Sequence, residues 1–200
     1  MIISKLFEQK KPVISFEIFP PKKEAELQNI DETLKTLATL HPDFISVTFG
    51  AGGSSADNRT VKLAQKIKRD YDIEPLVHLT CISNSKEEIK EILGQMETAG
   101  LKNVLALRGD VNPNVPAKDD FKYASELVSF IKGQGDFHVS GACYPEVHLE
   151  APDEVTDLRN LRKKVDAGAE HLVSQLFFDN NKFYDFLSKV RIAGIDTPVE

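Results

Sequence analysis

Six short apolar runs recur along the chain at a nearly constant interval, and each ends at or near a polar residue. The polar residues that mark them lie 31, 32, 30, 34 and 31 positions apart. These markers are Glu17, Thr48, Thr80, Asp110, Tyr144 and Gln175. Because one strand and one helix together occupy roughly 30 residues, the spacing predicts six consecutive βα units.

The apolar runs predict buried strands, and the segments between them predict helices. Continuous apolar runs of this length are typical of strands covered on both faces. Apolar residues three or four positions apart, as at Ile30, Leu34 and Leu37, are typical of amphipathic helices. Right-handed crossovers make such strands parallel, and the regular spacing favours a (β/α)8 TIM barrel over a doubly wound α/β sheet. The predicted strands lie within residues 13–19, 44–49, 76–81, 103–110, 137–144 and 171–178.

The number of predicted units is too small for a closed barrel. A (β/α)8 barrel has eight units and typically about 250 residues, whereas this sequence has 200 residues and six units. We expect residues 1–200 to form a single (β/α) barrel catalytic domain, truncated before strands 7 and 8. The alternative is an open six-stranded sheet with two exposed edges, which would be prone to aggregate.

Composition narrows the class of protein. The chain is 41% hydrophobic and 28% charged, as expected for one globular domain. Its net charge of −6 argues against non-specific nucleic-acid binding. The N-terminus lacks the apolar core of a secretory signal, and no apolar run is long enough to span a membrane, so we expect a cytoplasmic protein.

Cys81 and Cys143 are predicted to be buried, reduced thiols. The five histidines lack metal-ligand spacing, and no metal site is expected.

The centre of the sequence is the stretch 103–110, in which an apolar run stops abruptly at Arg108, Gly109 and Asp110. In parallel α/β folds, the loops just past the carboxyl ends of strands carry the chemistry, because the backbone there is firmly held and the side chains face a crevice. Asp110 is therefore expected at a functional site.

Glu17 lies within an apolar strand that two prolines end sharply. Burial among Phe16, Ile18 and Phe19 would raise the pKa of its carboxyl group, which makes Glu17 a plausible general acid. The alternative is a carboxylate paired with a neighbouring Lys or Arg. The sequence favours neither alternative.

Four other features have both a structural and a functional interpretation. The glycine-rich segment 47–55 is either a tight turn or a ligand-binding loop, with a helix starting at Ser55 or Asp57. His78 is either a core histidine or a ligand contact. Gln175 is a buried amide that needs a partner from a site wall or a loop. Four polar residues at helical spacing form either a solvated face or a binding face: Asp157, Asn160, Lys163 and Lys164.

Seven motifs, in this order and spacing, resemble the bacterial flavin-dependent 5,10-methylenetetrahydrofolate reductases: SFEIFPPK, VTFGAGGS, HLTC, LALRGD, YPEVH, LRNLRKKVDAGA and SQLFFD. The resemblance covers all 200 residues. It implies a (β/α)8 barrel that binds FAD without a Rossmann motif. It also implies reduction of methylenetetrahydrofolate to 5-methyltetrahydrofolate by NADH or NADPH, in one-carbon metabolism and methionine synthesis. A homo-oligomer is compatible with it.

The resemblance also assigns roles to individual residues. Glu17 becomes the general acid that protonates N10 as the imidazolidine ring opens. Asp110 lies near flavin and pterin and stabilises the cationic 5-iminium intermediate, while Gln175 contacts folate and nicotinamide. Phe49 stands where relatives often have tyrosine. The positions implied to bind FAD are Thr48, Phe49, Ala51, His78, Arg108, Gly109, Asp110, Tyr123, Ala124, Tyr144, His148, Ala151, Asp157, Asn160, Lys163 and Lys164.

Two competing hypotheses remain at the level of sequence. One is a truncated, inactive barrel that binds a flavin, another nucleotide or a partner protein; the presence of Glu17, Asp110 and Gln175 together argues against decay of the site. The other is a related flavin barrel that oxidises an amino acid such as proline, which the Glu17 strand and the stretch 103–110 fit poorly.

Overall fold

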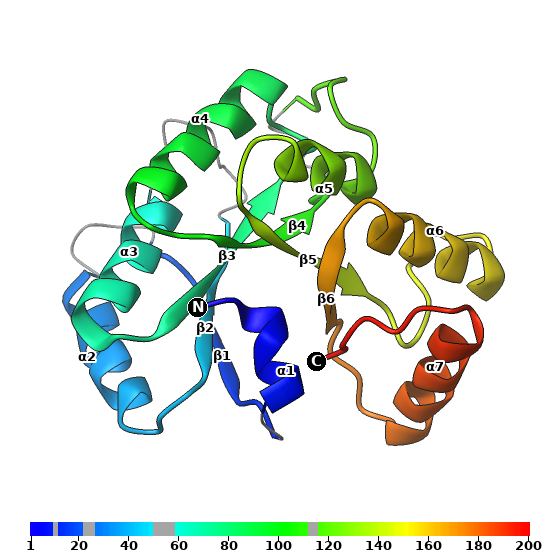
Figure 1. The fold of residues 1–200 in the computed structure, drawn as a ribbon, viewed down its shortest axis with the longest axis horizontal. Coiled ribbons are helices and arrows are strands. Elements are labelled where there is room, and N and C mark those ends of the chain that lie inside the picture. The colour runs from blue at the N-terminus through cyan, green and yellow to red at the C-terminus, as the bar shows by residue number, and fades with distance from the viewer. Residues whose placement is uncertain (10–11, 22–26, 50–58, 112–115) are drawn as a thin grey trace.

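Six parallel strands form one sheet in the order in which they occur along the chain (Figure 1). The computed structural model describes residues 1–9, 12–21, 27–49, 59–111 and 116–200. Sequential order distinguishes a barrel from a doubly wound sheet, in which the strand order reverses. The predicted arrangement, six units of a (β/α)8 barrel, is confirmed. The strands are β1 (Ser15–Ile18), β2 (Phe44–Val47), β3 (Glu74–Thr80), β4 (Asn103–Leu107), β5 (His138–Cys143) and β6 (Ala169–Ser174).

A helix follows each strand, as the apolar spacing predicted, and these helices cover the outside of the curved sheet (Figure 1). Side chains that cap the first turn define where two of these helices begin. Ser85 and Glu88 form a capping box at the start of α4, and Asp153 caps α6 by accepting a hydrogen bond from Thr156 N at 2.7 Å. The helices are α2 (Leu27–Ala38), α3 (Arg59–Tyr71), α4 (Lys86–Thr98), α5 (Ala124–Lys132), α6 (Glu154–Asp166) and α7 (Asn180–Ile192). The expected helix starts at Ser55 or Asp57 lie outside the described residues.

The strand register gives the sheet two different faces, because alternate residues of a strand point to opposite sides. Outward residues such as Ile45, Val77 and Val104 are fully buried in the core that the sheet shares with the helices. Inward residues include Glu17, which pairs in register with Ser46, and His78. The inward face therefore holds polar groups as well as apolar ones.

A short helical segment at the N-terminus was not predicted from the sequence. It consists of η1 (Ile3–Lys5) and α1 (Leu6–Gln9), and it packs its apolar side chains against the inward residues Phe44, Leu76 and Leu105. The Asn103 side chain, at the start of β4, accepts a hydrogen bond from Ile3 N at 3.1 Å. The segment therefore closes the interior at the amino-terminal ends of the strands, opposite the ends that carry the predicted site.

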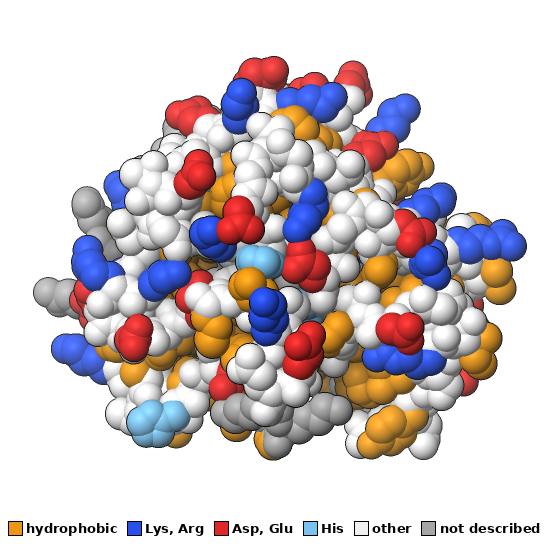
Figure 2. All heavy atoms as spheres, viewed as in Figure 1, with side chains coloured by type: hydrophobic (Ala, Val, Ile, Leu, Met, Phe, Trp, Pro, Cys, Tyr) orange, Lys and Arg blue, Asp and Glu red, His pale blue; other side chains and the backbone are white. Residues whose placement is uncertain are grey.

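Figure 2 shows the face that carries α1, on which basic and acidic side chains are interspersed. Among the described residues on this face there is no extended basic surface of the kind that binds nucleic acid. Across the described part of the chain, no helix is long and apolar enough to cross a membrane.

Candidate active site

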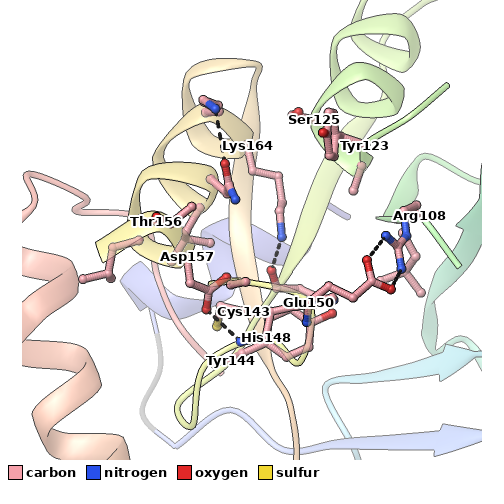
Figure 3. A pocket seen from close by; sticks show the side chains of 18 of the residues that line it. Arg108, Tyr123, Ser125, Cys143, Tyr144, His148, Glu150, Thr156, Asp157 and Lys164 are labelled. Atoms are coloured by element: carbon pink, nitrogen blue, oxygen red, sulfur yellow. Dashed lines mark hydrogen bonds and ion pairs between the residues drawn. The ribbon is translucent and has the colours of Figure 1, made fainter. Parts of the chain in front are cut away.

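A pocket of about 430 Å3 lies beside the carboxyl ends of β4 and β5, where α6 and the loop that precedes it form the opposite wall (Figure 3). This volume lies in the range of small-molecule and cofactor sites. Segments far apart in sequence meet here. The pocket brings together most of the predicted FAD-binding residues: Arg108, Tyr123, Ala124, Tyr144, His148, Ala151, Asp157, Asn160, Lys163 and Lys164.

The helical face of α6 that carries Asp157, Asn160, Lys163 and Lys164 lines the pocket. Lys164 crosses the carboxyl end of β5 and donates a hydrogen bond from Nζ to Ala142 O at 2.5 Å. Its ammonium group lies 5.9 Å from the centre of the Tyr144 ring. Burial lowers the pKa of Lys164, because its ammonium group is poorly solvated at the wall of the pocket. Lys163 lies one position away and donates to Asn160 Oδ1 at 3.2 Å.

The loop between β5 and α6 forms a hydrogen-bonded corner. His148 N donates to Asp157 Oδ2 at 3.1 Å, and the His148 ring lies perpendicular to Tyr144 with 4.6 Å between ring centres. Glu150 N donates to His148 Nδ1 at 3.1 Å. Because Nδ1 accepts, a neutral His148 carries its proton on Nε2, which is then available as a donor. Val147 adopts a φ of 69°, a strained value for a β-branched residue, in the turn that makes this corner.

Arg108 and Glu150 form a bidentate ion pair at one side of the pocket (Figure 3). Arg108 NH1 lies 2.5 Å from Glu150 Oε2, and NH2 lies 2.6 Å from Oε1. The pair keeps the pKa of Glu150 below its usual value and raises that of Arg108. No local sequence pattern connects Glu150 to Arg108, because the two residues are 42 positions apart.

Glu17 and His78 lie together on the inward face of the sheet, away from the residues that line this pocket. Glu17 Oε2 is 3.6 Å from His78 Nε2; the Glu17 side chain is 51% exposed and that of His78 only 8%. Partial burial raises the pKa of Glu17, as predicted, while burial lowers the pKa of His78 to about 4. His78 is therefore neutral near pH 7. Among the described residues, no Lys or Arg forms an ion pair with Glu17, and its role as a general acid stays a prediction.

Several other predicted residues lie outside the pocket. Asp110 and Gln175 are exposed at the ends of β4 and β6. The expectation that Gln175 is a buried amide is wrong: its side chain is exposed, and its Oε1 accepts a hydrogen bond from Leu176 N at 2.9 Å. Phe49 packs against the outer core, and Thr48 N donates to Ile18 O. Ala51 lies outside the described residues, as does most of the glycine-rich loop.

Both cysteines are free and buried, which confirms the predicted burial. Cys143 lines the pocket, and burial raises the pKa of its thiol to about 12. The thiol is therefore protonated near neutral pH and is a poor nucleophile. Within the described ranges, no group of three or more His, Cys, Asp or Glu side chains could hold a metal ion.

Gly109 is needed for the turn that follows β4. Its φ is +87°, and a Cβ atom there would lie 3.1 Å from Thr80 Cβ and 3.2 Å from Ile82 Cγ2. We expect Gly109→Ala to lower the free energy of unfolding by about 1–3 kcal/mol, because alanine is strained at positive φ and its methyl group would crowd the side chains of Thr80 and Ile82. Urea denaturation measures the change.

Gly94 provides the matched control for this substitution. It lies in the exposed interior of α4, and a Cβ atom there would meet nothing within 4 Å. Gly94→Ala should raise the free energy of unfolding by about 0.5–1 kcal/mol, because alanine favours the helix. Equal effects of the two substitutions would show that the turn does not require glycine.

Comparison with protein families gives one match over nearly the whole chain. The family model described as methylenetetrahydrofolate reductase matches residues 2–199. The 5,10-methylenetetrahydrofolate reductase of Pectobacterium carotovorum subsp. carotovorum is 40% identical over 186 residues, which is 93% of this chain and 61% of that protein. The Escherichia coli (strain K12) protein of the same name is 39% identical over 93% of this chain and 62% of its own length. The chain thus spans about 61% of the length of these relatives.

Solved structures share the fold at much lower sequence identity. An uncharacterised protein from Clostridium thermocellum, which binds two copies of 5-methyl-5,6,7,8-tetrahydrofolic acid, superposes with a TM-score of 0.68 at 15% identity, over 96% of this chain and 64% of that one. A phosphoenolpyruvate phosphomutase from Streptomyces platensis subsp. rosaceus also gives 0.68, at 14% identity, over 98% of this chain and 70% of its own. At such identities the similarity establishes the fold alone.

Proposed function

The chain belongs to the methylenetetrahydrofolate reductase family, and on that basis we propose that it forms the FAD-binding part of a cytoplasmic enzyme that reduces 5,10-methylenetetrahydrofolate to 5-methyltetrahydrofolate with NADH or NADPH. One observation carries the proposal beyond family membership. Residues that the family resemblance assigned to FAD, scattered between positions 108 and 164, line a single pocket in the folded chain.

The chemistry of the pocket fits a dinucleotide cofactor. Lys163, Lys164 and Arg108 provide cations for a diphosphate, and Asp157 and Asn160 provide acceptors for ribose hydroxyl groups. On the inward face, His78 Nε2 is buried without a hydrogen-bond partner among the described residues. A buried polar atom in this state is costly unless a ligand supplies the partner.

Side chains at the carboxyl ends of the strands supply the proton and the charge stabilisation that the reaction needs. Bound FAD supplies the transfer of a hydride from the nicotinamide to the folate. Glu17, with its raised pKa, donates a proton to N10 as the imidazolidine ring opens. Asp110 stabilises the cationic 5-iminium form of the folate, and Gln175 contacts the folate and the nicotinamide. The two substrates use the same site in turn, which gives ping-pong kinetics.

The test is the visible spectrum of the purified protein with FAD, followed by anaerobic addition of NADH. We expect a bound flavin band that NADH bleaches and methylenetetrahydrofolate restores. A protein that stays colourless after removal of free FAD would overturn the proposal that residues 1–200 hold the cofactor. A flavin that an amino acid such as proline bleaches, and that methylenetetrahydrofolate does not restore after reduction, would overturn the choice of substrate.

A further inference from the structure

Glu150 contacts Arg108, a residue that lines the pocket, although neither the motifs nor the family resemblance gave Glu150 a role. We infer that Glu150 is a positioning residue that holds Arg108 in the orientation needed to bind an anionic cofactor. This inference rests on the proposed function for the identity of the ligand. The contact that it requires is present in the structure.

The contacts of Arg108 hold its guanidinium group in place but do not use all of its hydrogen-bond donors. A guanidinium group has five N–H donors in a rigid fork. Three are used within the protein, because NH1 and NH2 each donate to one Glu150 oxygen and Nε donates to Gly109 O at 3.2 Å. Two donors remain, on a side chain that is 24% exposed and that lines the pocket. The guanidinium group can therefore bind an anionic ligand without first giving up its carboxylate.

The side chain and the backbone of Glu150 contact different residues, so the role of the side chain can be tested by itself. Its side chain contacts Arg108, whereas its backbone N–H holds His148 Nδ1. A substitution of the side chain leaves the backbone bond to His148 possible. Changing the side chain of Glu150 therefore tests the orientation of Arg108 and leaves the backbone hydrogen bond to His148 in place.

Two opposing effects decide how Glu150 changes cofactor affinity. Without its partner, Arg108 must lose rotamer freedom when the cofactor binds, and ordering one such side chain weakens binding by roughly two- to tenfold. Removing a carboxylate also makes the pocket more positive, which attracts an anion at long range. Salt at about 0.3 M shortens the screening length to roughly 6 Å and suppresses the second effect. The measurement is therefore made at that salt concentration.

The experiment is a double-mutant cycle on the dissociation constant for FAD, measured by quenching of flavin fluorescence. We expect Glu150→Gln to weaken FAD binding by about two- to tenfold. In the Arg108→Met background, the same substitution should have no further effect, because a residue that acts only through Arg108 loses its role when Arg108 is absent. Glu146→Gln, which removes the same charge from an exposed position of the same loop, is the matched control and should leave the constant unchanged.

A second measurement needs no cofactor. In the free protein, the Nη–H protons of Arg108 that are donated to Glu150 should give slowly exchanging NMR signals that are lost in Glu150→Gln and kept in Glu146→Gln. Equal effects of Glu150→Gln with and without Arg108, tighter FAD binding by that variant at high salt, or an Arg108 signal unchanged by the substitution would each overturn the inference. Failure of the wild-type chain to bind FAD would overturn the proposed function instead, and the NMR signal would then decide whether Glu150 holds Arg108.

Discussion

Replacing Glu17 with glutamine should slow reduction of methylenetetrahydrofolate by at least about 100-fold, the usual loss when a general acid is removed. Glutamine keeps the size of the side chain but has no acidic proton to donate. The half-reaction in which NADH or NADPH bleaches the flavin requires no proton from Glu17 and should continue at its wild-type rate. Anaerobic stopped-flow measurement of each half-reaction separates the two. Equal losses in both would contradict the assigned role.

The raised pKa of Glu17 gives this prediction a pH dependence with a definite sign. The acid form is present below the pKa of the folded protein and disappears as the pH rises through it. The rate of the folate half-reaction in the wild type should therefore fall with rising pH over that range, and the residual rate of Glu17→Gln should not.

The free energy of unfolding of Glu17→Gln shows whether a loss of activity comes from misfolding. A carboxyl group whose pKa is raised above its ordinary value of 4.5 binds its proton more tightly in the folded state, so its contribution to stability is lost as the pH rises through the folded pKa. Above that range, where the wild type buries part of a carboxylate, Glu17→Gln should be at least as stable as the wild type in urea denaturation.

Replacing Lys164 with methionine should weaken FAD binding by about 10- to 100-fold, the range expected for one lost hydrogen bond to a charged group. Methionine fills a similar volume beside Tyr144 but carries no charge. Equilibrium titration with FAD measures the change. Lys182→Met, which removes the same charge from an exposed position of α7, is the control and should leave the affinity for FAD unchanged.

The same substitution should stabilise the fold near neutral pH, so weaker binding would not result from unfolding. Burial lowers the pKa of Lys164, which means that the folded state carries a cost for the charged form. That cost is fully present below the lowered pKa and disappears as the pH rises to the ordinary value of 10.5. The gain in the free energy of unfolding of Lys164→Met should therefore shrink with rising pH. Destabilisation at pH 7 would contradict this account of the site.

The apolar pattern of the sequence predicted the order and the type of the elements. All six strands formed where apolar runs predicted them, since burial on both faces requires such runs. Boundaries shifted by up to four residues: the run at 171–178 became β6 at Ala169–Ser174, because its last aromatic residues belong to the following loop. The RGD triplet marked the end of β4 correctly, as its glycine adopts a backbone conformation that few other residues tolerate.

For α6, the sequence determined which residues share a face but not what that face contacts. Helical spacing placed Asp157, Asn160 and Lys164 on one side, where a solvated surface and a binding surface have the same pattern. Packing of α6 beside the carboxyl end of β5 turned this side toward the pocket. The family resemblance, rather than the periodicity, had indicated that outcome.

The contacts between distant loops could not be predicted from any local pattern and are seen only in the assembled fold. The fold paired Arg108 with Glu150 across 42 residues, placed α1 against the inward side chains of the sheet, and left Gln175 exposed beside β6. The physical reason is that periodicity records which side of each element is buried, a property of neighbouring residues. Which loop meets which depends on strand order, register and curvature, and these emerge only when the whole sheet is assembled.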